Sequence, residues 1–399
     1  MRILFVAMPF SIHTVRWISQ MNDTGWDLHL FPSMKFQPLH AEMRGVVYHE
    51  NFYDNLYERV PGNTYSSPHM PYLSFVRNGL LKKIIRKFAN TTGMDKSPAD
   101  ELAELIKKIR PDIIHSLETQ HAGYLVAQAK KKVAGKFPFP VWVHSNWGID
   151  LHFFGRLQKH IPLIREVLAG VNILLVEGKR DEMLARELGY QSKVQVFPSV
   201  GGGFHIPDGK PGKTSLRKKI LVKGTQDIVR RGVVALRALE RCADLLDEYE
   251  IILYSSNEIT RAVAELFTGH TGKQITILEG VDHAGMLQLN AEARINICVN
   301  ISDGLPNAML EAMLMGAFPI QSDTSLANEW IRSGETGMLV PPEDPDVIER
   351  AIREALLNDE LVDRAAVANR IQISEQLEYE HIKTSVTDMY RNAAKAFSS

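Results

Sequence analysis

The sequence predicts an α/β protein made of two doubly wound domains that face each other across a cleft. Short apolar, β-branched runs alternate with longer stretches of helical periodicity along the whole chain, as in parallel α/β sheets. A segment rich in Gly, Pro and Lys, residues 199–219, interrupts this pattern, which then restarts. The length of 399 residues also exceeds what one ordinary core supports.

The expected first domain covers residues 1–198. Its strand candidates lack a clean apolar and polar alternation, which is typical of strands covered by helices on both faces. The opening run, "MRILFVAMPF", is too short for a signal peptide or a membrane span and is interpreted as a buried strand. The candidates are residues 2–8, 27–33, 112–116, 141–145, 172–177 and 194–198.

The expected second domain covers residues 220–374, after the linker at 199–219. It contains helices at about 231–245 and 307–315, and a further helical stretch at about 375–396 follows it. Ligands of doubly wound sheets bind beyond the carboxyl ends of the strands, so we expect the site there. The strand candidates are residues 219–224, 250–256, 274–280, 295–300, 317–323 and 337–342.

The overall composition excludes several classes of protein. A formal net charge of -1 gives no global attraction to nucleic acid or to an anionic membrane. Cys242 and Cys298 do not form a CxxC pair, so neither a disulfide framework nor a zinc site is indicated. We expect a cytoplasmic protein that does not bind nucleic acid.

The segment "SDGLPNAMLEAMLMGAFPIQSD", residues 302–323, contains a carboxylate in an apolar helix. Pro306 suits the first helical position and Gly316 the helix end, which predicts a buried helix at 307–315. Glu311 lies in the middle of it and requires compensation, because an unpaired buried carboxylate costs several kcal/mol. The two hydroxyl groups of a ribose would provide this compensation, and a core Arg or Lys is the alternative.

The turn before this helix is suited to an anion. Gly304, Leu305 and the first helical turn present backbone N–H groups at the positive end of the helix, where phosphate binds readily. Asp303 would hold a second hydroxylated group beyond that phosphate, or it only shapes the turn. Hydroxyls, phosphate and hydroxyls in this order describe a nucleotide diphosphate sugar.

Residues 303–323, "DGLPNAMLEAMLMGAFPIQSD", resemble the signature of family 4 glycosyltransferases of the GT-B fold, which contains two acidic residues separated by seven positions. The similarity continues through residues 328–352 and, more weakly, through 176–200. The resemblance implies two Rossmann-like domains, with a C-terminal helix, about 375–399, that packs back on the first domain. It also implies transfer of a sugar, with retention, from a UDP- or GDP-sugar to a glycan, lipid-linked or small-molecule acceptor.

The resemblance assigns roles to the residues of this segment. Glu311 would bind the donor ribose, and Asp303 would contact sugar hydroxyls, although the family most often has Glu there. The backbone that would approach the diphosphate and the sugar is that of Gly304, Leu305, Pro306 and Asn307.

A second phosphate element is expected in "VKGTQDIVRRGVVAL", residues 222–236. Arg231 is at the position of the family's Lys, whereas Thr225 is at the position of its Arg. Lys223 or Arg230 would supply the missing charge and stabilise the departing diphosphate. A solvated start of the helix is the alternative interpretation.

The base of the nucleotide is expected to contact mainly backbone, around Ser255 and from Glu279 through Gly280 to Val281. No metal and no bound cofactor is expected, because cationic side chains and amides would replace the metal. The nucleotide diphosphate sugar is the donor substrate.

On the acceptor side, "SIHTVRW" follows the first strand, and His13 and Arg16 would share a helical face if the helix begins near Ser11. The Gly pair that the family has at this place is absent.

Further polar residues follow two later strands of the first domain. His115 and Glu118 are candidates for acceptor contact, as is Asp150, and His144 is a candidate catalytic residue. Family members often have a His in this second loop, and Trp147 aligns with it at least as well as His144 does. Each of these His residues has a structural role as its alternative.

The segment "VRNGLLKKIIRKF", residues 76–88, has an apolar stripe surrounded by basic residues. It predicts either peripheral contact with the inner face of a membrane or an ordinary core helix. Two functional alternatives also stay open, a nucleotide-sugar epimerase or hydrolase of the same fold and a non-catalytic scaffold, the latter because of Thr225.

Overall fold

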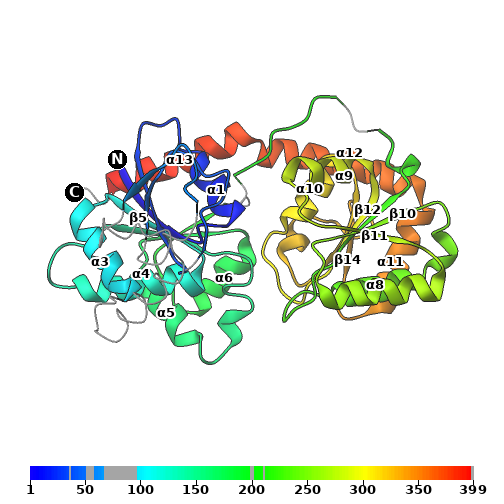
Figure 1. The fold of residues 1–399 in the computed structure, drawn as a ribbon, viewed down its shortest axis with the longest axis horizontal. Helices are drawn as coiled ribbons and strands as arrows, with labels where there is room; N and C mark the ends of the chain where they lie inside the picture. The colour runs from blue at the N-terminus through cyan, green and yellow to red at the C-terminus, as the bar shows by residue number, and fades with distance from the viewer. Residues whose placement is uncertain (36, 51–57, 67–96, 198–201, 210–211, 397–399) are drawn as a thin grey trace. The chain divides into compact units, whose positions relative to one another are not determined.

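The structure is a computed structural model (Figure 1). It describes residues 1–35, 37–50, 58–66, 97–197, 202–209 and 212–396. The basic segment 76–88 lies outside the described residues.

The chain divides into two compact units. Unit 1 comprises Met1–Gly202 together with Ile382–Ser399, and unit 2 comprises Gly203–His381. Most of the segment expected as a linker, 199–219, therefore belongs to unit 2. Phe204 is tied into this unit by a hydrogen bond from its N–H to the carbonyl of Leu377, at 2.7 Å.

Unit 1 contains an eight-stranded parallel sheet in the order β4-β3-β2-β1-β5-β6-β7-β8. The six predicted strands are confirmed. β3 and β4 were missed because each has only three residues, too few for a recognisable apolar run. The strands are β1 Arg2–Ala7, β2 Asp27–Pro32, β3 Val47–His49, β4 Thr64–Ser66, β5 Ile113–Leu117, β6 Val141–Ser145, β7 Ile173–Val176 and β8 Lys193–Val196.

Helices cover both faces of this sheet. α3, α4 and α5 share one core with Leu4 and Val6 of β1. On the other face, α1 meets α13 through a hydrogen bond from Trp17 Nε1 to the Tyr390 hydroxyl, at 2.8 Å. The helices are α1 Ile12–Ser19, α3 Pro98–Ile109, α4 Tyr124–Val133, α5 Ile161–Gly170, α6 Lys179–Glu187 and α13 Tyr379–Ala396.

Unit 2 contains a six-stranded parallel sheet in the order β11-β10-β9-β12-β13-β14. This is the strand order of a dinucleotide-binding fold, and all six predicted strands are present. They are β9 Lys219–Lys223, β10 Glu250–Tyr254, β11 Ile275–Leu278, β12 Ala293–Cys298, β13 Phe318–Ser322 and β14 Met338–Val340.

The helices of unit 2 also form two layers. α7, α8 and α11 pack in one core against the sheet, and α9 and α10 pack on Leu221 and Ile252 at the other face. Both faces are therefore covered, and the doubly wound α/β class is confirmed. The helices are α7 Gly232–Glu240, α8 Glu258–Thr271, α9 His283–Glu292, α10 Asn307–Met315, α11 Pro345–Leu357 and α12 Asp359–Leu377.

Two predicted helix boundaries and the role of Pro306 require correction, whereas the predicted bounds 307–315 of α10 are confirmed. α7 ends at Glu240 instead of continuing to 245, and a separate short 3-10 turn follows. Pro306 is the N-cap of α10 and not its first helical residue. The last helix begins at Tyr379 rather than near 375, because α12 continues to Leu377 and the extended backbone of Glu378 separates the two.

All strands within each sheet are parallel, so their carboxyl ends meet at one edge. This edge contains the loops after β1, β5 and β6 in unit 1, and after β9, β10, β11 and β12 in unit 2. None of the described helices is both long and apolar enough to cross a membrane.

Candidate functional site

Unit 2 has a cavity of about 480 Å³ at the carboxyl edge of its sheet. Five of the predicted donor residues line it together, although they come from four separate segments: Lys223, Ser255, Gly280, Val281 and Glu311. The remaining lining residues are Tyr254, Ser256, Arg261, Leu278, Glu279, Met286 and Ala308.

Glu311 lies at this cavity on the buried helix α10 and is 8% exposed. Its Oε1 is 3.1 Å from Nε2 of His283, whose side chain is 39% exposed. The carboxylate thus has a histidine at the surface as one partner. Sequence reasoning missed His283, although Asp282 before it is a recognisable helix cap, accepting from Gly285 N at 2.8 Å.

The turn before α10 is held by Asp303. Its Oδ1 accepts a hydrogen bond from Gly304 N and its Oδ2 accepts one from Asn300 Nδ2, both at 2.9 Å. Asp303 therefore shapes the turn, and its contact with a sugar stays a prediction. Gly304, Leu305 and Pro306 are buried, and the first residue of α10 that lines the cavity is Ala308.

The start of α10 nevertheless remains suited to an anion. The N-cap residue, Pro306, makes no side-chain capping hydrogen bond, in contrast to Asn257 at the start of α8. The helix dipole favours negative charge there, although Met309 N already donates to the Pro306 carbonyl, at 3.0 Å.

The loop between β9 and α7 closes on itself through glycine. A Cβ on Gly232 would lie 2.7 Å from the carbonyl oxygen of Gly224, so the two chain segments approach only because Gly232 has no side chain. The hydroxyl of Thr225, which stands in place of the family's Arg, donates to the Ser255 carbonyl at 2.7 Å. Arg231 N donates to the Val299 carbonyl at 3.0 Å, which fastens the loop to the end of β12.

Two of the three candidate cations in this loop are already paired. Arg230 NH1 lies 2.6 Å from Asp227 Oδ2, and Arg231 Nε lies 2.8 Å from Glu343 Oε1. Neither lines the cavity. Lys223 does line it, and its ammonium group has neither an ion pair nor a hydrogen bond in the part of the chain that the structure describes.

In unit 1, Glu118 organises the loop after β5. Its backbone is at φ 78° and ψ 158°, a region that residues other than Gly rarely occupy. Its buried Oε1 accepts from His121 N at 2.7 Å and from Ala122 N at 2.6 Å, and these bonds hold the strained backbone. The hydrogen bond from His121 Nδ1 to the same carboxylate raises the pKa of His121.

Asp150 joins this loop to the one after β6. Its Oδ2 accepts from Thr119 N at 2.8 Å and from Trp147 N at 2.9 Å. Burial raises the pKa of the Asp150 carboxyl well above its usual value, and the charge of Glu118 adds to the shift. Both carboxylates therefore cap backbone groups.

The two candidate histidines on the strands are buried. His144 Nδ1 bonds to Ser116 Oγ at 2.8 Å and its Nε2 to Thr119 Oγ1 at 3.0 Å, and burial lowers the pKa of His144 to about 4. His115 bonds to Ser145 and to the Tyr390 hydroxyl of α13. Both ring nitrogens of each histidine are thus within hydrogen-bond distance of neighbouring side chains, and a role of either residue in catalysis or acceptor binding stays a prediction.

The more accessible side chains on this edge are different ones. α1 begins at Ile12 after the Ser11 cap, and His13 and Arg16 both lie half-buried on it. The ring of His13 meets that of Trp147 edge to face, with centroids 5.8 Å apart. Trp147, which aligned with the family's His as well as His144 did, is thus the more accessible of the two.

Within the described residues, no group of three or more His, Cys, Asp or Glu side chains is placed to hold a metal ion.

Two family descriptions match this chain. "Glycosyl transferases group 1" matches residues 218–358, which lie in unit 2, and "Glycosyl transferase 4-like" matches residues 83–177, which lie in unit 1. Together the two matches cover more than half of the 399 residues.

Curated relatives include phosphatidyl-myo-inositol mannosyltransferases. The protein of Mycobacterium leprae is 25% identical over 189 residues, 47% of this chain and 50% of the relative. That of Mycobacterium tuberculosis is 24% identical over 183 residues, 44% of this chain and 48% of the relative. The alignment thus spans about half the length of these relatives.

Solved structures share the fold over nearly the whole chain. Sucrose-phosphate synthase from Thermosynechococcus elongatus has a TM-score of 0.72 at 15% identity, covering 99% of this chain and 100% of that one. Anabaena Alr3699/HepE in complex with UDP-glucose has a TM-score of 0.68 at 12% identity, covering 98% and 100%. The matched families, the site around α10 and the shared fold lead to one conclusion: the chain belongs to the family 4 glycosyltransferases of the GT-B fold.

Proposed function

We propose that the protein transfers a sugar from a UDP- or GDP-sugar to a glycan, lipid-linked or small-molecule acceptor, with retention of configuration. The observation that carries this proposal is the cavity of unit 2, where the carboxylate of Glu311, the ammonium of Lys223 and the loop of Gly280 and Val281 meet. These groups match the ribose, the diphosphate and the base of one nucleotide.

In the proposed complex, Glu311 accepts the two ribose hydroxyls, and the backbone at Ser255, Gly280 and Val281 surrounds the base. Lys223 is the cation that replaces the family's Arg, since Arg230 and Arg231 are engaged with Asp227 and Glu343.

Rate enhancement follows from the charge that develops in the reaction. When the glycosidic bond to the diphosphate breaks, negative charge grows on the leaving oxygens. Lys223 lines the cavity of unit 2, and we propose that it and the start of α10 stabilise that charge. Asp303 keeps its proposed contact with the sugar, acting from the turn that it holds. We propose that no metal is required; activity abolished by EDTA and restored by Mg²⁺ or Mn²⁺ would contradict this.

The acceptor is proposed to bind at the carboxyl edge of unit 1, where His13, Arg16 and Trp147 are accessible. The curated relatives are named for a lipid substrate, phosphatidyl-myo-inositol, and the HepE structure holds UDP-glucose. The HepE structure supports a sugar nucleotide donor, and the relatives support a lipid-linked acceptor.

Thermal unfolding of the full chain with UDP, GDP, ADP and CMP tests the donor site. A diphosphate present at about 100 times its Kd stabilises a protein by about 2.7 kcal/mol, which raises the melting temperature of the unit that binds it. We expect UDP or GDP to do so, and we expect the shift to vanish in Glu311→Ala. Absence of a shift with every nucleotide, or a shift that persists in Glu311→Ala, would contradict the proposed donor site.

A further inference from the structure

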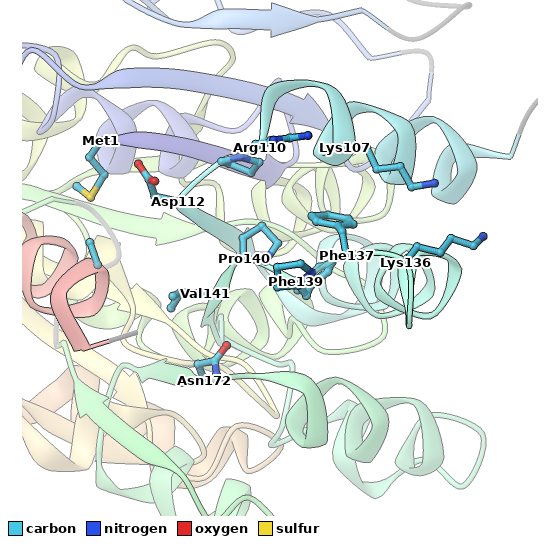
Figure 2. Close-up of a pocket in the computed structure, with 13 residues that line it drawn as sticks. Met1, Lys107, Arg110, Asp112, Lys136, Phe137, Phe139, Pro140, Val141 and Asn172 are labelled. Carbon is cyan, nitrogen blue, oxygen red and sulfur yellow. The ribbon is translucent and has the colours of Figure 1, made fainter. Parts of the chain in front are cut away.

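Unit 1 has a second cavity that the proposed reaction does not use. Its volume is about 1100 Å³, more than twice that of the donor cavity. It lies at the amino ends of β5, β6 and β7, where Asp112, Pro140 and Asn172 precede the strands (Figure 2). This is the edge opposite to the one that carries His13 and Trp147.

The charged side chains that line this cavity are mostly cationic. Lys107, Arg110 and Lys136 are exposed, and among the described residues the only lining carboxylate is that of Asp112. One oxygen of that carboxylate already accepts from the backbone N–H of Arg2, at 2.7 Å.

The cationic side chains of this cavity differ from two neighbouring lysines in having no carboxylate partner among the described residues. Lys131 and Lys132, at the end of α4, are paired with carboxylates at 2.6 and 2.7 Å. Lys107 and Arg110 have no side-chain partner in the described part of the chain, and Lys136 has only a backbone carbonyl, that of Lys132. The three cationic side chains that line the cavity thus have no carboxylate partner among the described residues, and the same holds for Lys108, which does not line it.

Arg110 is also placed at an energetic cost. It is the C-cap of α3 with φ 45° and ψ 65°, the left-handed conformation in which Gly is the common residue. An L side chain there costs roughly 1 kcal/mol relative to Gly. A strained Arg at the rim of a cationic cavity is the type of outlier that indicates a binding role.

The wall between the cations is apolar and stiff. Phe137 and Phe139 are half-buried and alternate with Pro138 and Pro140, whose rings restrict the backbone. The side-chain oxygen of Asn172 accepts from Trp142 N at 2.8 Å, and its NH₂ group has no partner among the described residues, so it can donate.

We propose that this cavity binds a phosphate monoester attached to an apolar group. Three cations against one carboxylate leave two positive charges, which match the charge of nearly -2 on a phosphate monoester at neutral pH. The guanidinium of Arg110 can bond two phosphate oxygens, and the Phe and Pro strip accommodates the apolar part.

Calorimetric titration of the full chain with phenyl phosphate and with inorganic phosphate tests the proposal. The titrations use a Lys223→Ala background, so that the cation proposed to bind phosphate in the donor cavity does not contribute. We expect saturable binding of phenyl phosphate, tighter than that of inorganic phosphate by about tenfold because of the apolar contact. Phe137→Ala should remove that difference.

Arg110→Gly is the decisive variant, because Gly removes the guanidinium and also relieves the left-handed backbone. We expect its melting temperature to be unchanged or higher, while phenyl phosphate binds about tenfold or more weakly. Lys107→Ala should weaken binding as well. Lys108→Ala is the matched control, since Lys108 is an exposed lysine of the same helical turn that does not line the cavity.

Three results would overturn the proposal: no saturable binding, equal affinity of the Arg110→Gly variant and the parent, or equal losses from Lys108→Ala and Lys107→Ala. Vesicles with and without phosphatidic acid in phosphatidylcholine distinguish the source of the ligand. Vesicle binding that requires phosphatidic acid and is lost in Arg110→Gly identifies a lipid, and phenyl phosphate binding without vesicle binding identifies a free metabolite.

Discussion

The carboxyl edges of the two sheets use their polar side chains in opposite ways. In unit 1, Glu118, Asp150 and His144 are buried and bonded to the loops that carry them. In unit 2, Glu311 and Lys223 line a cavity. A polar residue just past a strand end thus indicates either a ligand contact or a loop support, and its hydrogen-bond partners decide which.

The largest expected effect that tests this contrast is the loss of a loop support. Glu118→Ala leaves the N–H groups of His121 and Ala122 without an acceptor, which should destabilise the loop by about 2 to 3 kcal/mol. Hydrogen exchange at these two amides should accelerate by about 30-fold or more. Glu118→Gln retains an acceptor oxygen and should be much less affected. Unchanged protection of these two amides from hydrogen exchange in the Ala variant would show that Glu118 does not stabilise the loop.

Next in size is the loss of the cavity cation. Lys223→Ala should weaken the binding of a nucleoside diphosphate by about 30-fold, because a charge-assisted hydrogen bond contributes about 2 kcal/mol. The same substitution should leave the binding of the parent nucleoside unchanged. Arg231→Ala, the matched control, should have a smaller effect because its guanidinium is held by Glu343. Binding titrations with both ligands measure the difference, and a larger loss in Arg231→Ala would reverse the assignment.

A smaller effect is expected from the buried charge of Asp150. Its raised pKa means that the folded protein retains this proton to higher pH than the unfolded chain does. The folded state therefore loses stability as pH rises above the unfolded value of about 4. Asp150→Asn keeps the acceptor oxygen and has no carboxyl group to ionise, so it avoids this loss. The melting temperature of the variant relative to the parent should therefore rise with pH. At neutral pH we expect the variant's free energy of unfolding to be higher by about 1 kcal/mol. A melting-temperature difference that shrinks as pH rises would contradict the shift.

The smallest effect concerns His283, which orients Glu311. His283→Ala should weaken nucleotide binding by about threefold, since one neutral hydrogen bond contributes about 1 kcal/mol or less. His283→Gln offers an amide N–H in place of Nε2–H and should restore most of the affinity. A nucleotide titration that shows tighter binding by the Ala variant would instead mean that His283 competes with the ribose for the carboxylate.

The elements with strong local signals were predictable. The apolar runs of the long strands, and the Pro306 and Gly316 boundaries of α10, each follow from a few adjacent residues. The strands β3 and β4 were not predictable, since pairing with neighbouring strands stabilises these three-residue segments. The end of α7 at Glu240 likewise depends on packing more than on helix propensity.

The donor side of the site was also accessible from sequence, because Glu311 in an apolar helix requires an explanation whatever surrounds it. The acceptor side was not. His115 and His144 have the same residue type as a catalytic histidine, and they lie within β5 and β6. Only their partners, Tyr390 from the far end of the chain and Thr119 from the next loop, show that both rings are occupied.

The sequence by itself determined the two doubly wound sheets, the buried helix α10 and the glycosyltransferase signature, because periodicity and spacing along the chain encode them. Only the tertiary structure decided that Lys223, and neither Arg230 nor Arg231, lines the cavity, and that His283 pairs with Glu311. Only the tertiary structure showed that Lys107, Arg110 and Phe137 line the same cavity of unit 1. Contacts of this kind join segments far apart in the chain, and their free energy depends on distances that no local pattern records.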